Sequence, residues 1–194
     1  RHSLRASNAH HLFVDSEHGS IVDSALHEDT PLPHEAMYVL EEETTDSQGL
    51  ATPILDELRA AAPKLRANTY SPRNSDIFCY IFTSGTTGLP KAAIIRNQRM
   101  LGAAYLFGRL MHSCSPGDVV YVTLPLYHTN AMLLGWGSVL ATGSTLALRR
   151  KFSASSFWDD IVKYRATSFV YIGELCRYLL NTAKNPQERA HRLR

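Results

Sequence analysis

The sequence predicts an α/β fold in which largely parallel sheets are layered with helices. Two observations lead to this prediction. From residue 76 onward, short apolar runs typical of buried strands alternate with segments of helical periodicity. In addition, residues 83–91 and 125–129 are rich in functional groups, and each stretch directly follows an apolar run. Because ligand sites in parallel α/β sheets collect at the carboxyl ends of strands, both stretches are candidate site segments.

The composition is typical of a soluble globular protein, and 194 residues are enough for one core. The formal net charge of +2 and the absence of a basic stripe do not favour nucleic acid as a partner. Cys79, Cys114 and Cys176 have neither metal-ligand nor disulfide-framework spacing. They suit a reducing compartment, either the cytoplasm or the cytoplasmic face of a membrane. No apolar run approaches the length of about 18 residues that a spanning helix needs.

Residues 1–75 combine short apolar pieces with turn signals, and we expect them to form a peripheral part of the domain. The pattern predicts strands at 11–14 and 37–40, a short helix or strand at 21–26, and a helix at 54–62. The histidines of this part fit no metal-binding spacing, so we interpret them as solvated surface and expect no metal site. They are His10, His11, His18, His27 and His34.

Residues 76–194 are expected to form the core of the domain. Strands are predicted at 77–82, 119–124, 145–148 and 168–172, and a short apolar run occupies 92–95. Helices are predicted from Asn97 as N-cap to about residue 112, over 131–141 until Gly143, after an N-cap at Ser153 or Ser155, and from Gly173.

The predicted helix 131–141 is unusually apolar and contains Gly135 and Gly137. Since glycine weakens a helix, two of them predict close packing against a neighbour or a ligand. The apolar stretch 132–140 therefore suits buried core, the wall of a tunnel for an apolar ligand or a membrane-contacting surface. No lysine or arginine occurs between Arg109 and Arg149, which favours core or tunnel.

The segment 83–91, Thr-Ser-Gly-Thr-Thr-Gly-Leu-Pro-Lys, offers hydroxyls, glycine-freed backbone N–H groups and one lysine, as a polyphosphate loop requires. It is not a Walker A loop. Pro90 stands where that motif has its second glycine, and Ala92 replaces the hydroxyl residue that would bind magnesium. We therefore expect a phosphate loop of another kind, with a kinase or other NTPase as a remote alternative.

Residues 80–91 resemble the nucleotide-binding signature of the adenylate-forming (AMP-binding) superfamily, which includes acyl-CoA synthetases, luciferases and adenylation domains of peptide synthetases. Residues 124–128, Leu-Pro-Leu-Tyr-His, match its second core motif, which borders the acyl-substrate site in relatives. Residues 150–160 and 171–180 look like the branch of fatty-acid transport proteins and very-long-chain acyl-CoA synthetases.

The resemblance implies a partial N-terminal AMP-binding domain over residues 1–194, with the core at 76–194 and the phosphate loop at 83–91. Relatives also carry an adenine motif, a ribose-binding aspartate, a hinge and a C-terminal domain with a catalytic lysine. None of these can be located before Arg194, and the start lacks both an initiator methionine and a signal peptide. We therefore expect an internal fragment that lacks the C-terminal domain and is incomplete for catalysis.

The implied activity is the ATP-dependent conversion of a long-chain or very-long-chain fatty acid to acyl-AMP and then to acyl-CoA. It implies ATP, Mg²⁺ and coenzyme A as co-substrates and cofactors. Lys91 and His128 would have catalytic roles. Binding of the cofactor would fall to Thr83, Ser84, Gly85, Thr86, Thr87, Gly88 and Lys91.

Two alternatives stay open. Another carboxylate activator, such as an aryl-CoA ligase or a peptide-synthetase domain, is disfavoured by the segments 157–160 and 171–174. A lipid-uptake protein that associates peripherally with a membrane, and acts by binding with little ligase activity, is the alternative from a different class.

Overall fold

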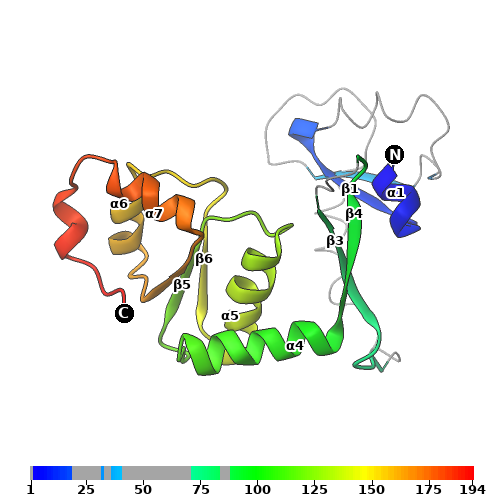
Figure 1. Ribbon diagram of the computed structural model, residues 1–194, viewed down its shortest axis with the longest axis horizontal. Helices are drawn as coiled ribbons and strands as arrows, with labels where there is room; N and C mark the ends of the chain where they lie inside the picture. Colours follow the sequence, from blue (N-terminus) through cyan, green and yellow to red (C-terminus); the bar gives the residue numbers. More distant parts are fainter. Residues whose placement is uncertain (1, 19–31, 33–35, 41–70, 84–87) are drawn as a thin grey trace. The chain divides into compact units, whose positions relative to one another are not determined.

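The computed structural model describes residues 2–18, 32, 36–40, 71–83 and 88–194 (Figure 1). The chain forms two compact units. One unit comprises Arg1–Pro72 and Phe82–Ala92, and the other comprises Arg73–Ile81 and Ala93–Arg194. Each unit is described by itself.

The first unit contains a small parallel sheet. Helix α1 (His2–Ser7) precedes strand β1 (Leu12–Asp15), which pairs in parallel with β2 (Met37–Leu40). A short 3-10 helix, Ser16–His18, follows β1. The sequence predicted both strands but not α1. The segments predicted at 21–26 and 54–62 lie outside the described residues.

Strands β3 (Ile77–Thr83) and β4 (Lys91–Arg96) pair as a two-stranded sheet. This confirms the predicted strand 77–82 and shows that the apolar run 92–95 is a strand as well. Ile81 and Ile95 are buried together with Met100 and Leu133, which lie on the helices that follow. The apolar character of both strands thus has a physical cause in this shared core.

The main sheet of the second unit is three-stranded and entirely parallel. Its strands are β5 (Val119–Val122), β6 (Thr145–Leu148) and β7 (Ser168–Val170), in the order β6-β5-β7. The predicted strands 119–124 and 168–172 are thus each two residues shorter than the sequence suggested. The central strand, β5, is buried on both faces, which explains its uninterrupted apolar sequence.

Helices cover both faces of this sheet. On one face, Val120, Val122 and Val170 pack with Ala131 of the helix that follows β5. On the other face, Tyr121 packs with Phe157 and Ile161 of helix α6 (Phe157–Lys163). Because successive side chains of a strand point to opposite faces, adjacent residues of β5 serve different cores. The predicted layered α/β fold is confirmed.

The helix predicted at 131–141 spans Asn130–Thr142, with a π-helical first part (Asn130–Trp136) and an α-helical second part, α5 (Gly137–Thr142). Gly143, with φ at +69°, ends it as predicted. The segment packs on the sheet and on α4 (Asn97–Tyr105), and its glycines lie at these contacts. A Cβ on Gly137 would meet Met100 Cε at 3.2 Å. The close packing is therefore with protein neighbours, as buried core requires.

Two predicted N-caps were wrong. Asn97 is the first residue of α4 and Arg96 is the N-cap, without a side-chain hydrogen bond. The Asn97 amide instead donates to the Arg73 carbonyl at 2.8 Å, so it ties the helix to the turn before β3. Likewise, the N-cap of α6 is Ser156 and neither Ser153 nor Ser155. Ser153 Oγ accepts the backbone N–H of Ser156 at 3.3 Å, so its hydrogen bond lies before the first residue of the helix.

The helix that starts at Asn97 continues beyond α4 as a π-helical segment, Leu106–Met111. After β7, helix α7 spans Gly173–Leu180, and a 3-10 helix follows at Pro186–Arg189. Among the helices that the structure describes, none has both the length and the apolar character needed to cross a membrane.

Candidate functional site

The predicted phosphate loop connects β3 to β4, and the ends of the two strands meet at its base. Thr83 Oγ1, on the last residue of β3, donates to the carbonyl of Lys91, the first residue of β4, at 3.4 Å. The structure therefore brings together the two described ends of the predicted loop. Ser84, Gly85, Thr86 and Thr87 lie outside the described residues.

Gly88 has a φ of +119°, a conformation that residues with a Cβ rarely adopt. This supports the prediction that a glycine at position 88 frees the backbone of the loop. A Cβ at this position would meet no atom within 4 Å, so the requirement for glycine comes from the backbone and not from crowding.

Lys91 is exposed, as a side chain that contacts a soluble anion must be. The residue before it is fixed through its main chain, because the ring Nε2 of His2 donates to the Pro90 carbonyl at 2.8 Å. This contact could not be predicted from the sequence, since α1 itself was not predicted. A backbone held on both sides of Lys91 limits where its ammonium group can reach.

His128 lies in the turn after β5, as predicted, and belongs to the second unit. Its N–H donates to the Pro125 carbonyl at 2.9 Å, and its own carbonyl accepts the N–H of Met132 at 3.0 Å. The imidazole is exposed and its centroid lies 4.7 Å from that of Tyr127. The main chain of His128 is thus fixed between the strand end and the helix, while the ring is free to contact a ligand.

An ion pair missed by the sequence analysis lies at the same edge of the sheet. Arg149 follows β6, and its guanidinium pairs with the carboxylate of Asp160 on α6. Asp160 also accepts the hydroxyl of Tyr121 at 2.7 Å. Burial raises the pKa of Tyr121, while the nearby Arg149 acts in the opposite direction. The only signal in the sequence was a tyrosine within an otherwise aliphatic strand, whose hydroxyl needs a partner when buried.

Helix α7 begins at this edge with an exposed ion pair. Hydrogen bonding from Arg177 lowers the pKa of Glu174 to about 2. The side chains of Tyr171 and Ile172, which precede the helix, are also exposed. This edge therefore offers aromatic and charged groups from the segments that follow both β5 and β7.

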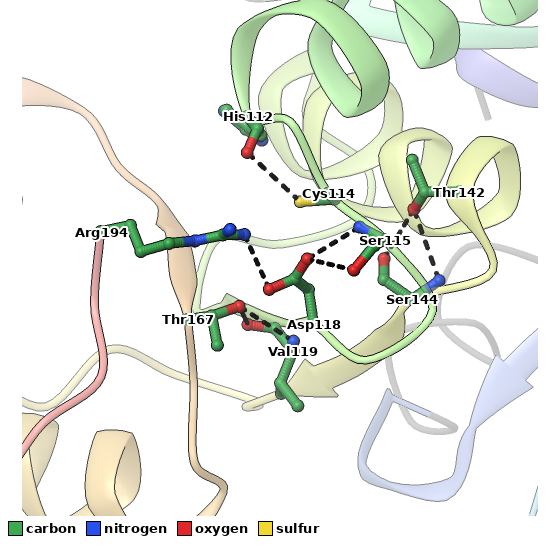
Figure 2. Close-up of polar contacts among 9 residues, drawn as sticks. All are labelled: His112, Cys114, Ser115, Asp118, Val119, Thr142, Ser144, Thr167 and Arg194. Carbon is green, nitrogen blue, oxygen red and sulfur yellow. Dashed lines mark hydrogen bonds and ion pairs between the residues drawn. The ribbon is translucent and has the colours of Figure 1, made fainter.

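The opposite, amino-terminal ends of the strands hold a second polar cluster (Figure 2). Asp118, just before β5, accepts the N–H of Ser115 at 2.7 Å and its hydroxyl at 2.9 Å. Its other oxygen pairs with the Arg194 guanidinium at 2.7 Å. Burial alone would raise the pKa of Asp118, but hydrogen bonds from Ser115 and Thr167 and the charge of Arg194 lower it. Since both carboxylate oxygens are engaged and residues 125–129 follow the opposite end of β5, we assign this cluster a structural role.

The histidines that the structure describes in the first unit, His10, His11 and His18, are exposed, which confirms the interpretation as solvated surface. His27 and His34 lie outside the described residues. One exposed group, Asp15, Glu17 and His18, has its ligand atoms within 4.8 Å of one another. Exposed acidic groups of this kind are common without an ion, and nothing else points to a metal there.

Comparison with solved structures shows the fold. The N-terminal domain of FACL13 from Mycobacterium tuberculosis superimposes with a TM-score of 0.80 at 18% identity, covering 100% of this chain and 45% of that chain. A benzoate CoA ligase from Burkholderia xenovorans LB400 gives a TM-score of 0.78 at 21% identity, covering 100% of this chain and 36% of that chain.

Curated sequences include relatives at higher identity. The medium/long-chain-fatty-acid–CoA ligase FadD6 of Mycobacterium tuberculosis is 48% identical over 128 residues, 66% of this chain and 21% of the relative. Long-chain fatty acid transport protein 1 of Homo sapiens is 46% identical over 144 residues, 74% of this chain and 22% of the relative. The matched part of this chain thus spans about a fifth of the length of these relatives.

The family model described as "AMP-binding enzyme" matches residues 1–194. This match, together with the fold and the relatives, confirms the resemblance that the motifs at 80–91 and 124–128 indicated. The chain belongs to the family of AMP-binding enzymes.

Proposed function

We propose that the protein containing this chain activates long-chain or very-long-chain fatty acids, first to acyl-AMP and then to acyl-CoA. The observation that carries the proposal is the base of the loop, where Thr83 and Lys91 meet and Gly88 adopts a positive φ. A loop with these features, in a chain of the AMP-binding enzyme family, suits the phosphates of ATP. The relatives named as a medium/long-chain-fatty-acid–CoA ligase and a long-chain fatty acid transport protein support a fatty acid as the other substrate.

In this proposal the hydroxyls and backbone N–H groups of the loop hold the β- and γ-phosphates. Lys91 supplies positive charge where a carboxylate must approach a polyanion, an approach that charge repulsion otherwise opposes. His128 borders the acyl group. The phosphate-binding set is the one that the sequence indicated: Thr83, Ser84, Gly85, Thr86, Thr87, Gly88 and Lys91.

The chemistry has two steps. A fatty carboxylate oxygen attacks the α-phosphorus of ATP, which forms acyl-adenylate and releases pyrophosphate. The thiolate of coenzyme A then attacks the acyl carbonyl carbon and displaces AMP. Mg²⁺, when bound, would neutralise phosphate charge and be held largely by phosphate oxygens and water, as is usual for this ion.

We further propose that this chain is part of an N-terminal AMP-binding domain, with residues 1–75 peripheral and residues 76–194 forming the core. The match to the FACL13 N-terminal domain, of which this chain covers 45%, supports the first part of this proposal, that the chain is a piece of an N-terminal domain. The cysteines, Cys79, Cys114 and Cys176, are all free, which suits the cytoplasm or the cytoplasmic face of a membrane.

The test is ATP–pyrophosphate exchange by the whole protein, measured with and without a long-chain fatty acid. Exchange that depends on the fatty acid is expected. Labelled pyrophosphate enters ATP only by reversal of the adenylation step, and that step requires the carboxylate. Exchange driven by benzoate or an amino acid, but not by a fatty acid, would identify another carboxylate activator. Fatty-acid binding without any exchange would instead favour an uptake protein, the function suggested by relatives named transport proteins.

A further inference from the structure

The chain that leads from the phosphate loop into β4 is held by two side chains from different elements. Thr83 Oγ1 donates to the Lys91 carbonyl at 3.4 Å, and the ring Nε2 of His2 donates to the Pro90 carbonyl at 2.8 Å. Two consecutive carbonyl groups therefore have side-chain donors, one from β3 and one from α1. All four residues belong to the first unit.

The contact with His2 suits the residue that it holds. A proline has no backbone N–H, so a hydrogen bond can hold its main chain only through the carbonyl. Because a carbonyl oxygen only accepts hydrogen bonds, the Nε2 atom of His2 carries the proton. The proline ring also restricts φ at position 90, and Gly88 has a φ of +119°. With the Pro90 carbonyl held as well, the last part of the loop, residues 88–91, has little conformational freedom left.

His2 is itself part of a folded element. It is the first residue of α1, and the chain turns after this helix at Asn8, which has a φ of +51°. The N–H of Ala9 closes the turn by donating to the Leu4 carbonyl at 3.3 Å, and β1 then begins at Leu12. The imidazole thus reaches the loop from a helix that is joined directly to the parallel sheet of the same unit.

A phosphate loop gains affinity from being ordered before its ligand arrives. Ordering a flexible segment during binding costs conformational entropy, which is subtracted from the free energy of its contacts with the ligand. The tether at Pro90 acts next to Lys91, whose ammonium group is proposed to face the phosphates. A loop freed from His2 would have to be ordered by ATP itself.

We propose that His2 is a positioning residue for the phosphate loop, holding residues 88–91 in the conformation that receives the triphosphate of ATP. In this role His2 acts through the Pro90 carbonyl and not by touching the nucleotide. The inference rests on the proposed function, from which it takes ATP as the ligand of the loop.

The experiment compares the whole protein with its His2→Ala and His2→Gln variants in two measurements. One is the KM for ATP in fatty-acid-dependent ATP–pyrophosphate exchange, and the other is the Kd for ATP, determined by equilibrium dialysis without a fatty acid. His2→Ala removes the donor and should raise both constants about fivefold, the equivalent of about 1 kcal/mol, which is typical of one hydrogen bond. His2→Gln should bring both constants back towards those of the unaltered protein, because the glutamine amide also donates to a carbonyl. The KM for the fatty acid should stay the same in both variants.

The matched control is His10→Ala, which removes an exposed histidine of the same unit, just before β1. Its KM and Kd for ATP should equal those of the unaltered protein. A general contribution of His2 to folding would lower the melting temperature and the maximal rate of exchange without raising either constant, and that result would overturn the proposal. An equal loss in His2→Gln would also overturn it, because the hydrogen bond would then not be the cause.

The two measurements separate this inference from the proposed function. If the unaltered protein binds ATP but shows no exchange with a fatty acid, the proposed function fails, and the Kd for ATP still tests His2. If exchange depends on the fatty acid and His2→Ala leaves both constants unchanged, only the positioning role of His2 fails.

Discussion

Gly135 lies against Val122 of β5 so closely that a Cβ on residue 135 would meet Val122 Cγ2 at 2.7 Å. Val122 is fully buried in the central strand and packs with Val170 of the adjacent strand. A β-branched side chain in this position has few other rotamers. The π-helical segment Asn130–Trp136 therefore packs on the sheet at a distance that only glycine allows.

The first prediction concerns this contact. Gly135→Ala gains up to about 1 kcal/mol of helix propensity. The added methyl group also overpacks the core, which costs about 1–3 kcal/mol. We expect a cost at the upper end of that range, because the contact with Val122 is so short. We expect a net loss of about 1–2 kcal/mol in the free energy of unfolding, measured in urea. The control is Gly102→Ala in α4, where a Cβ would meet nothing within 4 Å; it should be neutral or stabilising by up to about 1 kcal/mol. Equal effects of the two substitutions would contradict the packing argument.

The second prediction concerns acid stability. The folded-state pKa of Asp118 lies below its ordinary value of 3.8, so the folded protein holds this proton less tightly than the unfolded chain does. The resulting stabilisation is complete above 3.8 and is lost as the pH falls through the lower, folded-state pKa. Asp118→Asn should therefore lower stability at neutral pH by about 1–3 kcal/mol and flatten the acid limb of the stability profile.

Urea unfolding across that pH range measures this effect. Asp159→Asn on α6 is the comparison, because that aspartate is exposed and the hydrogen bond that it accepts from Asn185, at 3.2 Å, can also be accepted by the oxygen of an asparagine side chain. The profile of Asp159→Asn should follow that of the unaltered protein. An Asp118→Asn profile that retains the full acid dependence would assign the loss of stability to other carboxylates.

A structural feature could be predicted from the sequence where the residues that determine it are close together in the chain. Strand β5 was predicted because burial on both faces produces an apolar run that is visible without knowing the partner strand, and the short runs of β6 and β7 are also rich in apolar residues. The close packing of Gly135 and Gly137 could be predicted because glycine in a helix has a local cost. These signals lie within a few residues of the structure that they indicate.

The polar contacts could not be predicted in the same way. Asp118 and Arg194 are 76 positions apart, and Tyr121 and Asp160 are 39 apart. The fold alone brings them together, and each residue by itself reads as an ordinary surface or core position. Asn97 shows the same limit at a helix end. Its side chain could have capped the helix that starts beside it, but its amide donates to the carbonyl of Arg73, 24 positions away.

The third prediction tests the backbone of the phosphate loop. An alanine at position 88 would be held at a φ of +119°, which costs about 1–3 kcal/mol, although it clashes with nothing. The loop is expected to relieve this strain by moving. Gly88→Ala should therefore raise the KM for ATP in the exchange reaction about tenfold, because the N–H groups proposed to face the phosphates shift.

Gly117→Ala is the matched control for Gly88→Ala. Gly117 is also an exposed turn glycine with open space around it, but it lacks a positive φ. Exchange by this variant should match that of the unaltered protein. A normal KM for ATP in Gly88→Ala would show that the loop does not need this conformation to hold the nucleotide.

The fourth prediction concerns the charge at the base of the loop. Lys91 is exposed on the first residue of β4, with its backbone fixed by Thr83 on the carbonyl of residue 91 and by His2 on the carbonyl of residue 90. Removing the ammonium group with Lys91→Ala leaves this backbone in place and removes a charge that would face the developing phosphate anion. Fatty-acid-dependent exchange should fall about a hundredfold, as for other donors aimed at transition-state charge. Lys184→Ala, which removes another exposed lysine, after α7, should leave exchange unchanged. Full exchange in Lys91→Ala would show that this lysine has no part in the chemistry. Gly88 and the loop hydroxyls would remain the proposed phosphate ligands, because the substitution leaves the backbone and those side chains intact.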